Sequence, residues 1–244
     1  MIMDSISLIV FDLDGTLIDS KADIANSVNE ALAQEGFPTL EPKIIQGFVG
    51  RGLSHLIRDT LGNPSDEEAK RVAEGFWNHY MKHLLDETGL SLGRERILES
   101  STGFARAVVT NKPYAFSKKI LEGLKIDHHF RWLIGGDSLP IQKPSPQVFD
   151  PIFADFEERP RGIIIGDSQI DIDCGKAAGL LTCGVTYGYR DREEIVSAQP
   201  DFMIDRFEEL KSLPLSGLKK INRHVQSADI RNPKKPRHEE TRTW

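Results

Sequence analysis

Cysteine is scarce in this sequence of 244 residues, which contains only Cys174 and Cys183. Two cysteines are too few for a disulfide framework, and a chain of this length buries a core without such cross-links. We therefore expect both cysteines to be buried free thiols and the protein to be cytoplasmic, where thiols stay reduced.

Long hydrophobic runs are also missing. The longest one near the start, Ile6 to Phe11, is interrupted by Ser7 and followed by Asp12, and no basic region precedes it. It is too short for the apolar part of a secretory signal, and no segment approaches the roughly 20 apolar residues of a membrane span. We expect neither secretion nor a membrane partner.

The body of the chain has no net positive charge. The formal net charge is −6, but residues 219–244 contain eight Lys and Arg against three Asp and Glu, so residues 1–218 carry −11. An acidic body argues against a nucleic-acid groove, which needs clustered positive charge. The basic end has no apolar periodicity, which is typical of a solvated, disordered extension.

Six short apolar runs rich in β-branched residues recur along the chain, and several end in polar residues. Runs of this kind, without alternation, are typical of strands buried on both faces of a parallel sheet. Helical patterns lie between some of them, at residues 114–124 and 171–178. This alternation predicts a doubly wound, mostly parallel α/β sheet of Rossmann-like type. The predicted strands are residues 6–11, 105–109, 131–134, 162–165, 180–185 and 202–204.

The stretch from about Ser20 to Leu85 breaks this rhythm. Apolar residues recur there at helical spacing in three successive segments, with no strand between them. Glycine and proline mark the ends of the segments at residues 36–38 and 62–64. An inserted helical subdomain is predicted. The expected division is an α/β core at residues 1–18 and 86–215, a helical cap at residues 19–85, and a tail at residues 216–244.

Polar side chains follow several predicted strands directly. Because the carboxyl ends of parallel strands form one edge of a sheet, these side chains should share a crevice, and Lys143 can reach it from a short loop. Carboxylate oxygens suit Mg²⁺, whereas lysine and backbone amides suit a phosphate. A site of both kinds favours phosphoryl transfer. The strand-end residues are Asp12, Asp14, Thr110, Asn111 and Asp167.

Four segments resemble the motifs of the haloacid dehalogenase-like hydrolases, in the order that this family has them. They are Phe11-Asp12-Leu13-Asp14-Gly15-Thr16-Leu17, Val109-Thr110-Asn111-Lys112, Lys143-Pro144 and Gly166-Asp167-Ser168-Gln169-Ile170-Asp171. Within that superfamily, three stretches and the helical insertion are similar to phosphoglycolate phosphatases. These stretches are residues 110–113, 135–137 and 185–189.

The resemblance implies Mg²⁺-dependent hydrolysis of a small phosphate monoester, above all 2-phosphoglycolate. Asp12 would attack phosphorus and form an aspartyl-phosphate, and Asp14 would be the general acid and base. The implied metal ligands are Asp12, the backbone carbonyl of Asp14, and Asp167, with Asp171 in support. The implied phosphate-binding groups are Gly15, Thr110, the backbone at Asn111, and Lys143. The expected partner is a small phosphorylated metabolite, and the expected state is a monomer or homodimer.

Other activities remain open at this point. Within the superfamily they are a pyrophosphatase, a sugar-phosphate phosphatase or mutase, and a phosphonate hydrolase. The alternative from a different functional class is a catalytically idle binding protein that keeps the same fold. One segment departs from the family: Leu92-Gly93-Arg94 stands where an aromatic-Pro-Gly-Val turn is usual. This departure affects the returning hinge of the cap, and with it closure and turnover.

Selectivity for a carboxylate in the leaving group is expected to come from the cap. Arg51 lies between Gly50 and Gly52 in a loop that opens a predicted helix near Leu53. Glycines allow close backbone approach, and the forked guanidinium of arginine matches a carboxylate. Arg51 is therefore the predicted specificity residue, although a solvated arginine in a turn explains the same pattern.

Overall fold

A single parallel sheet forms the centre of the computed structural model, which describes residues 6–90, 98–99 and 104–213. The strand order is β3-β2-β1-β4-β5-β6, and every neighbouring pair is parallel. All six predicted strands and the parallel arrangement are confirmed. The strands are β1 (Leu8–Phe11), β2 (Ala105–Val109), β3 (Trp132–Ile134), β4 (Gly162–Gly166), β5 (Leu181–Val185) and β6 (Phe202–Ile204).

Both faces of the sheet are covered. All four residues of β1 are buried, and they alternate between two apolar clusters: Ile9 and Phe11 in one, Leu8 and Val10 in the other. Helix α6 contributes to the first cluster, and helices α7 and α8 contribute to the second. The doubly wound fold is thus confirmed. The helices of this part are α6 (Tyr114–Gly123), α7 (Asp150–Phe153), α8 (Gln169–Ala177) and α9 (Arg192–Ser197), with 3₁₀ turns at Asp127–His129, Pro146–Phe149 and Phe207–Ser212.

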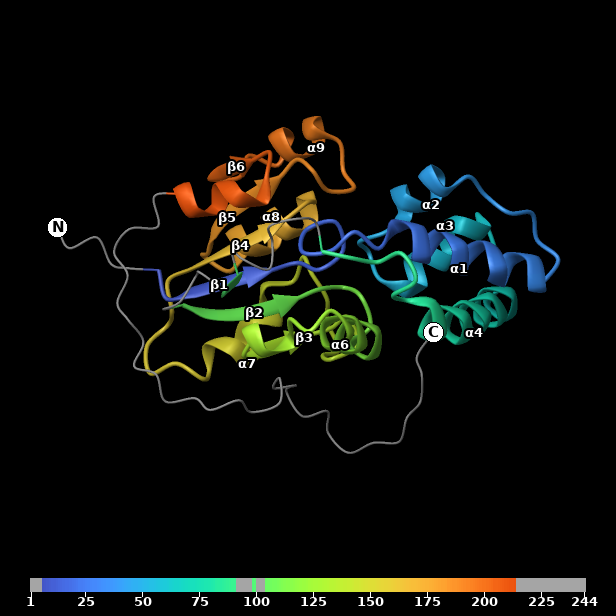
Figure 1. The fold of residues 1–244 in the computed structure, drawn as a ribbon, viewed down its shortest axis with the longest axis horizontal. Helices are drawn as coiled ribbons and strands as arrows, with labels where there is room; N and C mark the ends of the chain where they lie inside the picture. Colours follow the sequence, from blue (N-terminus) through green and yellow to red (C-terminus); the bar gives the residue numbers. More distant parts are fainter. Residues whose placement is uncertain (1–5, 91–97, 100–103, 214–244) are drawn as a thin grey trace.

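In the described residues 19–90, which follow β1, four helices come one after another on the side of the sheet toward which the strand arrows point (Figure 1). Three of them were predicted. The additional helix, α2, is short and buries only Ile45, so its sequence has little amphipathic pattern. The helices are α1 (Lys21–Gln34), α2 (Pro42–Phe48), α3 (Leu53–Leu61) and α4 (Asp66–His83).

The two connections between this helical insertion and the sheet are joined to each other. Asp19 and Gly89 form an antiparallel bridge. Asp23, at the start of α1, accepts hydrogen bonds from the backbone N–H of Glu87 and from the N–H and hydroxyl of Thr88. The exact division into core and cap stays a prediction. The altered segment Leu92–Arg94 and the tail lie outside the described residues.

Among the described residues, no helix has both the length and the apolar character needed to cross a membrane.

Candidate active site

The carboxyl ends of β1, β2 and β4 place the predicted residues at one edge of the sheet. The backbone N–H of Asp12 still bonds to β4, at Ile165, and that of Thr110 to β3, at Ile134, so the residues that follow each strand are held in register. Seven of the nine predicted residues line one cavity of about 50 Å³. They are Asp12, Asp14, Thr110, Asn111, Lys143, Asp167 and Asp171.

Three buried carboxylates form the acidic part of this cavity. Asp12, Asp167 and Asp171 each offer an oxygen, and these oxygens lie within 4.8 Å of one another. Burial raises the pKa of Asp12 to about 6, and burial together with the neighbouring carboxylates raises the pKa of Asp167 well above its usual value. Concentrated negative charge on hard oxygen donors is the environment that a divalent cation stabilises. The residues present therefore fit a divalent metal ion.

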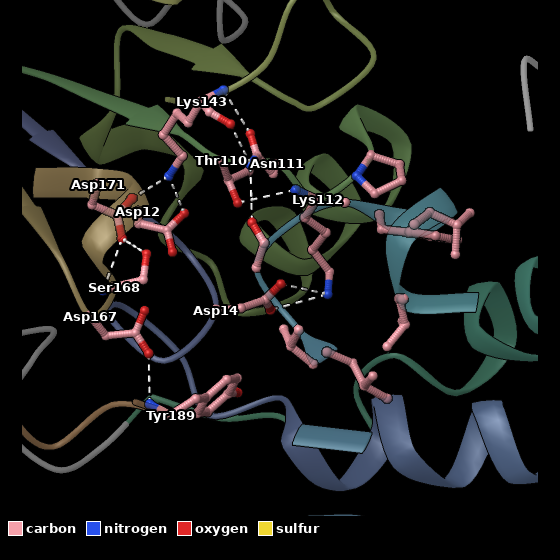
Figure 2. Close-up of a pocket in the computed structure, with 18 of the residues that line it drawn as sticks. Asp12, Asp14, Thr110, Asn111, Lys112, Lys143, Asp167, Ser168, Asp171 and Tyr189 are labelled. Carbon is pink, nitrogen blue, oxygen red and sulfur yellow. Dashed lines mark hydrogen bonds and ion pairs between the residues drawn. The ribbon is translucent and has the colours of Figure 1, made fainter. Parts of the chain in front are cut away.

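Lys143 is the cation next to these carboxylates (Figure 2). Its Nζ lies 2.8 Å from an oxygen of Asp12 and 2.6 Å from an oxygen of Asp171. Burial alone would lower the pKa of Lys143, but the attraction of both carboxylates outweighs burial and raises this pKa above its usual value. Lys143 is therefore a charged residue that partly neutralises the acidic cluster.

The side chain of Asn111 holds the loop that carries Lys143. Its Oδ1 accepts from the backbone N–H of Lys143, and its Nδ2 donates to the carbonyl oxygens of Lys143 and Gly50, each at 3.0 Å. This side chain thus joins the β2 end, the Lys143 loop and the helical insertion. The predicted phosphate contact was assigned to the backbone of Asn111 and is compatible with this role.

Hydrogen bonds from neighbouring residues fix the orientation of two of the carboxylates, Asp171 and Asp167. Ser168 is the N-cap residue of α8, and its N–H and hydroxyl both donate to one oxygen of Asp171, which leaves the other oxygen for Lys143. The N–H of Tyr189 donates to Asp167 at 2.6 Å.

Gly15 packs directly against Asp167. Its φ is +78°, and a Cβ atom at this position would lie only 2.2 Å from Oδ2 of Asp167. Only glycine fits both the backbone conformation and the space, so Gly15 allows the Asp12–Asp14 loop to approach Asp167.

Asp14 lies in a separate group of contacts, apart from the Asp12–Lys143–Asp171 group in Figure 2. It accepts from the hydroxyl of Ser20 at 2.5 Å, and Nζ of Lys112 lies 3.1 Å from both of its oxygens. Thr110 accepts from the backbone N–H of Lys112 and lines the cavity beside it. Ser20 and Lys112 were not predicted as site residues, although Lys112 stands in the second motif.

The cap side of the cavity is largely apolar. Among the cap residues that line the cavity, only Tyr80 of α4 has a polar group in its side chain, and Gly50 and Gly52 come from the loop before α3. The part of a ligand that extends from the acidic side toward the cap would therefore lie among apolar side chains, next to Lys112. The apolar cap residues are Ile24, Val49, Leu53, Leu56 and Phe76.

Arg51 is not among the residues that line the cavity. Its guanidinium forms an ion pair with Asp59 of α3, and 48% of its side chain is exposed. A contact between Arg51 and a substrate would require that pair to open, and the assignment stays a prediction.

The loop after β5 connects the acidic cluster to the insertion. Arg190 donates to the carbonyl oxygens of Gly47, at 2.7 Å, and Val49, and Gln46 donates to the carbonyl oxygen of Tyr189 at 3.2 Å. Since the N–H of Tyr189 also bonds to Asp167, one dipeptide contacts both the acidic cluster and the end of α2.

This fold and site define a hydrolase built on a doubly wound parallel sheet, with a helical insertion above an acidic centre. The chain belongs to the haloacid dehalogenase-like hydrolase family, whose model matches residues 9–185. The residues that carry the four motifs are those that meet at the strand ends.

Several relatives and solved structures are similar over most of their length. The chain is 36% identical to the phosphoglycolate phosphatase of Haemophilus influenzae, over 84% of this chain and 97% of that protein. It is 35% identical to that of Vibrio cholerae, over 83% of this chain and 94% of that protein. A crystal structure described as a predicted phosphoglycolate phosphatase from Haemophilus somnus has a TM-score of 0.80 and 32% identity, covering 86% of this chain and 98% of its own.

Proposed function

We propose that this chain is a Mg²⁺-dependent phosphatase that hydrolyses a small phosphate monoester, with 2-phosphoglycolate as the substrate. The observation that carries the proposal is the pairing of two carboxylate groups at the end of β1. Asp12 lies in the acidic cluster with Lys143, and Asp14, two residues later, lies in its own group of contacts. The names of the relatives and the small cavity support the choice of substrate.

In the first step, a carboxylate oxygen of Asp12 attacks phosphorus, and the bond between phosphorus and the leaving oxygen breaks. Asp14 gives its proton to that oxygen, so glycolate leaves as an alcohol and Asp12 becomes an aspartyl-phosphate. Asp14 is suited to this because Ser20 and Lys112 hold both of its oxygens in place.

In the second step, Asp14 takes a proton from a water molecule, which attacks phosphorus. The bond between phosphorus and the Asp12 oxygen breaks, inorganic phosphate forms, and Asp12 is restored. Dividing one displacement into two lets the same pair of residues serve both halves of the reaction.

The remaining predicted residues bind the metal and the phosphoryl group. Asp12, Asp167 and the backbone carbonyl of Asp14 would hold Mg²⁺, with Asp171 in support. When bound, the metal neutralises charge between the phosphate and Asp12. Gly15, Thr110, the backbone N–H of Asn111 and Lys143 would contact the phosphoryl oxygens and stabilise the charge that develops there.

Steady-state hydrolysis tests the proposal. p-Nitrophenyl phosphate is assayed with Mg²⁺ and with EDTA, and a panel of phosphorylated metabolites is then ranked by kcat/KM. We expect Mg²⁺-dependent turnover, with 2-phosphoglycolate first in the ranking. Absence of turnover with Mg²⁺ would indicate an idle binding protein, and preference for pyrophosphate or a sugar phosphate would overturn the substrate assignment. The cytoplasmic location and the oligomeric state, monomer or homodimer, stay predictions.

A further inference from the structure

Lys112 is a buried cation in the half of the cavity where the leaving group would lie. Its side chain is 5% exposed, and its Nζ lies 3.1 Å from each oxygen of Asp14. Of the two lysines that line the cavity, Lys143 is bound by Asp12 and Asp171, on the acidic side. Lys112 therefore supplies the positive charge on the cap side.

The ammonium group of Lys112 retains a donor for a ligand. It carries three N–H groups, and two suffice for the two oxygens of Asp14. Nζ lies 4.6 Å from the centre of the Tyr80 ring, and the other cap side chains that line the cavity are apolar. A bound anion would thus meet a partly desolvated cation, where an ion pair is stronger than in water.

The position of Lys112 next to Asp14 sets the distance at which an anion would be recognised. In the proposed reaction Asp14 contacts the leaving oxygen, and Lys112 contacts Asp14. In 2-phosphoglycolate only one CH₂ group separates the leaving oxygen from the carboxylate. A cation bonded to the general acid therefore lies within reach of that carboxylate without any change in the cap.

We propose that Lys112 is a specificity-determining residue that binds a carboxylate on the carbon next to the leaving oxygen, so that the enzyme selects phosphate esters of short 2-hydroxy acids. This inference rests on the proposed phosphatase function and assigns the carboxylate contact to Lys112 instead of Arg51. Arg51 is paired with Asp59, whereas Lys112 already faces the cavity.

The test compares three substrates that differ only near the leaving oxygen. 2-Phosphoglycolate has the carboxylate, ethyl phosphate has the same carbon chain without it, and the phosphate ester of 3-hydroxypropionate carries it one carbon further away. The wild-type protein should prefer 2-phosphoglycolate to both others by at least tenfold in kcat/KM. This comparison needs no variant and is independent of any effect of substitution on folding.

Lys112→Met and Lys112→Gln remove the charge and should reduce the ratio of kcat/KM for 2-phosphoglycolate to that for ethyl phosphate by about 10- to 100-fold, as expected for a charged hydrogen bond. Ser20→Ala is the matched control, because it removes the other contact to Asp14 and leaves the cation in place. Ser20→Ala should slow both substrates equally and leave the ratio unchanged. Melting temperatures and circular dichroism identify any variant that fails to fold.

Each outcome decides one question. If Lys112→Met lowers kcat/KM equally for both substrates, as Ser20→Ala does, Lys112 only positions Asp14 and the inference is wrong. If Arg51→Ala lowers the ratio and Lys112→Met does not, the carboxylate contact belongs to Arg51. If the wild-type protein has the same kcat/KM for ethyl phosphate and for 2-phosphoglycolate, no carboxylate is recognised, although the phosphatase function stands. Only absence of Mg²⁺-dependent hydrolysis of any ester contradicts the phosphatase function itself.

Discussion

Replacement of Lys143 by methionine should destabilise the metal-free protein strongly at neutral pH. Lys143, Asp12 and Asp171 have side chains that are 3%, 11% and 1% exposed, and Nζ bridges the two carboxylates. Methionine is similar in length but has neither the charge nor the N–H donors of lysine, so Asp12 and Asp171 would stay buried without their partner. Breaking a buried pair in this way costs about 3–5 kcal/mol. For a protein of this size, that loss lowers the melting temperature by roughly 6–20 °C.

The loss should depend on pH in a definite direction. Burial already raises the pKa of Asp12 to about 6, above the 3.8 of an ordinary aspartate, and Lys143 opposes this rise. Without Lys143 the pKa of Asp12 rises further. A carboxyl group whose pKa is higher in the folded than in the unfolded protein lowers stability as pH increases through the interval between those two values. Lys143→Met should therefore lose most stability near pH 8 and least near pH 4.

Thermal and urea unfolding in EDTA at pH 4, 6 and 8 measure this effect. Lys118→Met is a suitable control, because Lys118 forms an exposed ion pair with Glu122, and such pairs contribute about 0–1 kcal/mol. Equal melting temperatures for Lys143→Met and Lys118→Met at pH 8, or a loss that does not change with pH, would refute the reasoning.

Three further predictions follow from the same contacts and from the sequence. Mg²⁺ should raise the melting temperature more at pH 8 than at pH 5, because protons compete with the metal for Asp12 and Asp167, whose pKa values are raised. Scanning fluorimetry measures this gain. A gain that does not change with pH, or an equal gain in Asp167→Asn, would contradict the prediction. Arg190→Ala removes two hydrogen bonds to the end of α2 and should lower kcat/KM by about tenfold, whereas unchanged kinetics would show that these bonds do not hold the cap over the site. Cutting the chain after Leu218 should change neither kcat/KM nor the melting temperature, since the basic tail has little apolar surface; a large fall in either would show that the tail packs on the core.

The sheet and most of the insertion were predictable because their signals are local. A run such as Ile163–Ile165 is β-branched and apolar throughout, which is what burial on both faces requires, and it forms the middle of β4. α2 was missed because one buried side chain in seven residues gives no helical periodicity. α9 has the same property, with only Ile195 buried in six residues.

The site was predictable to the level of strand ends and motifs, and no further. Sequence order shows that Asp12 and Asp167 follow neighbouring strands, because parallel strands end at one edge. It does not show that the side chain of Lys112 turns toward Asp14, since that contact joins residues 98 positions apart. In the same way, the pairing of Arg51 with Asp59 depends on how the turn before α3 directs the side chain, which residue type and spacing do not specify.

The most direct test of the central claim is detection of the phosphorylated aspartate. The enzyme is mixed with 2-phosphoglycolate and Mg²⁺, quenched in acid within milliseconds, digested, and examined by mass spectrometry, with Asp12→Asn as the control. We expect one added phosphoryl group on the peptide that contains Asp12, none in Asp12→Asn, and a fall in turnover of about 10³-fold or more in that variant. Steady release of phosphate by Asp12→Asn at near the wild-type rate, or a phosphoryl group on another residue, would contradict it.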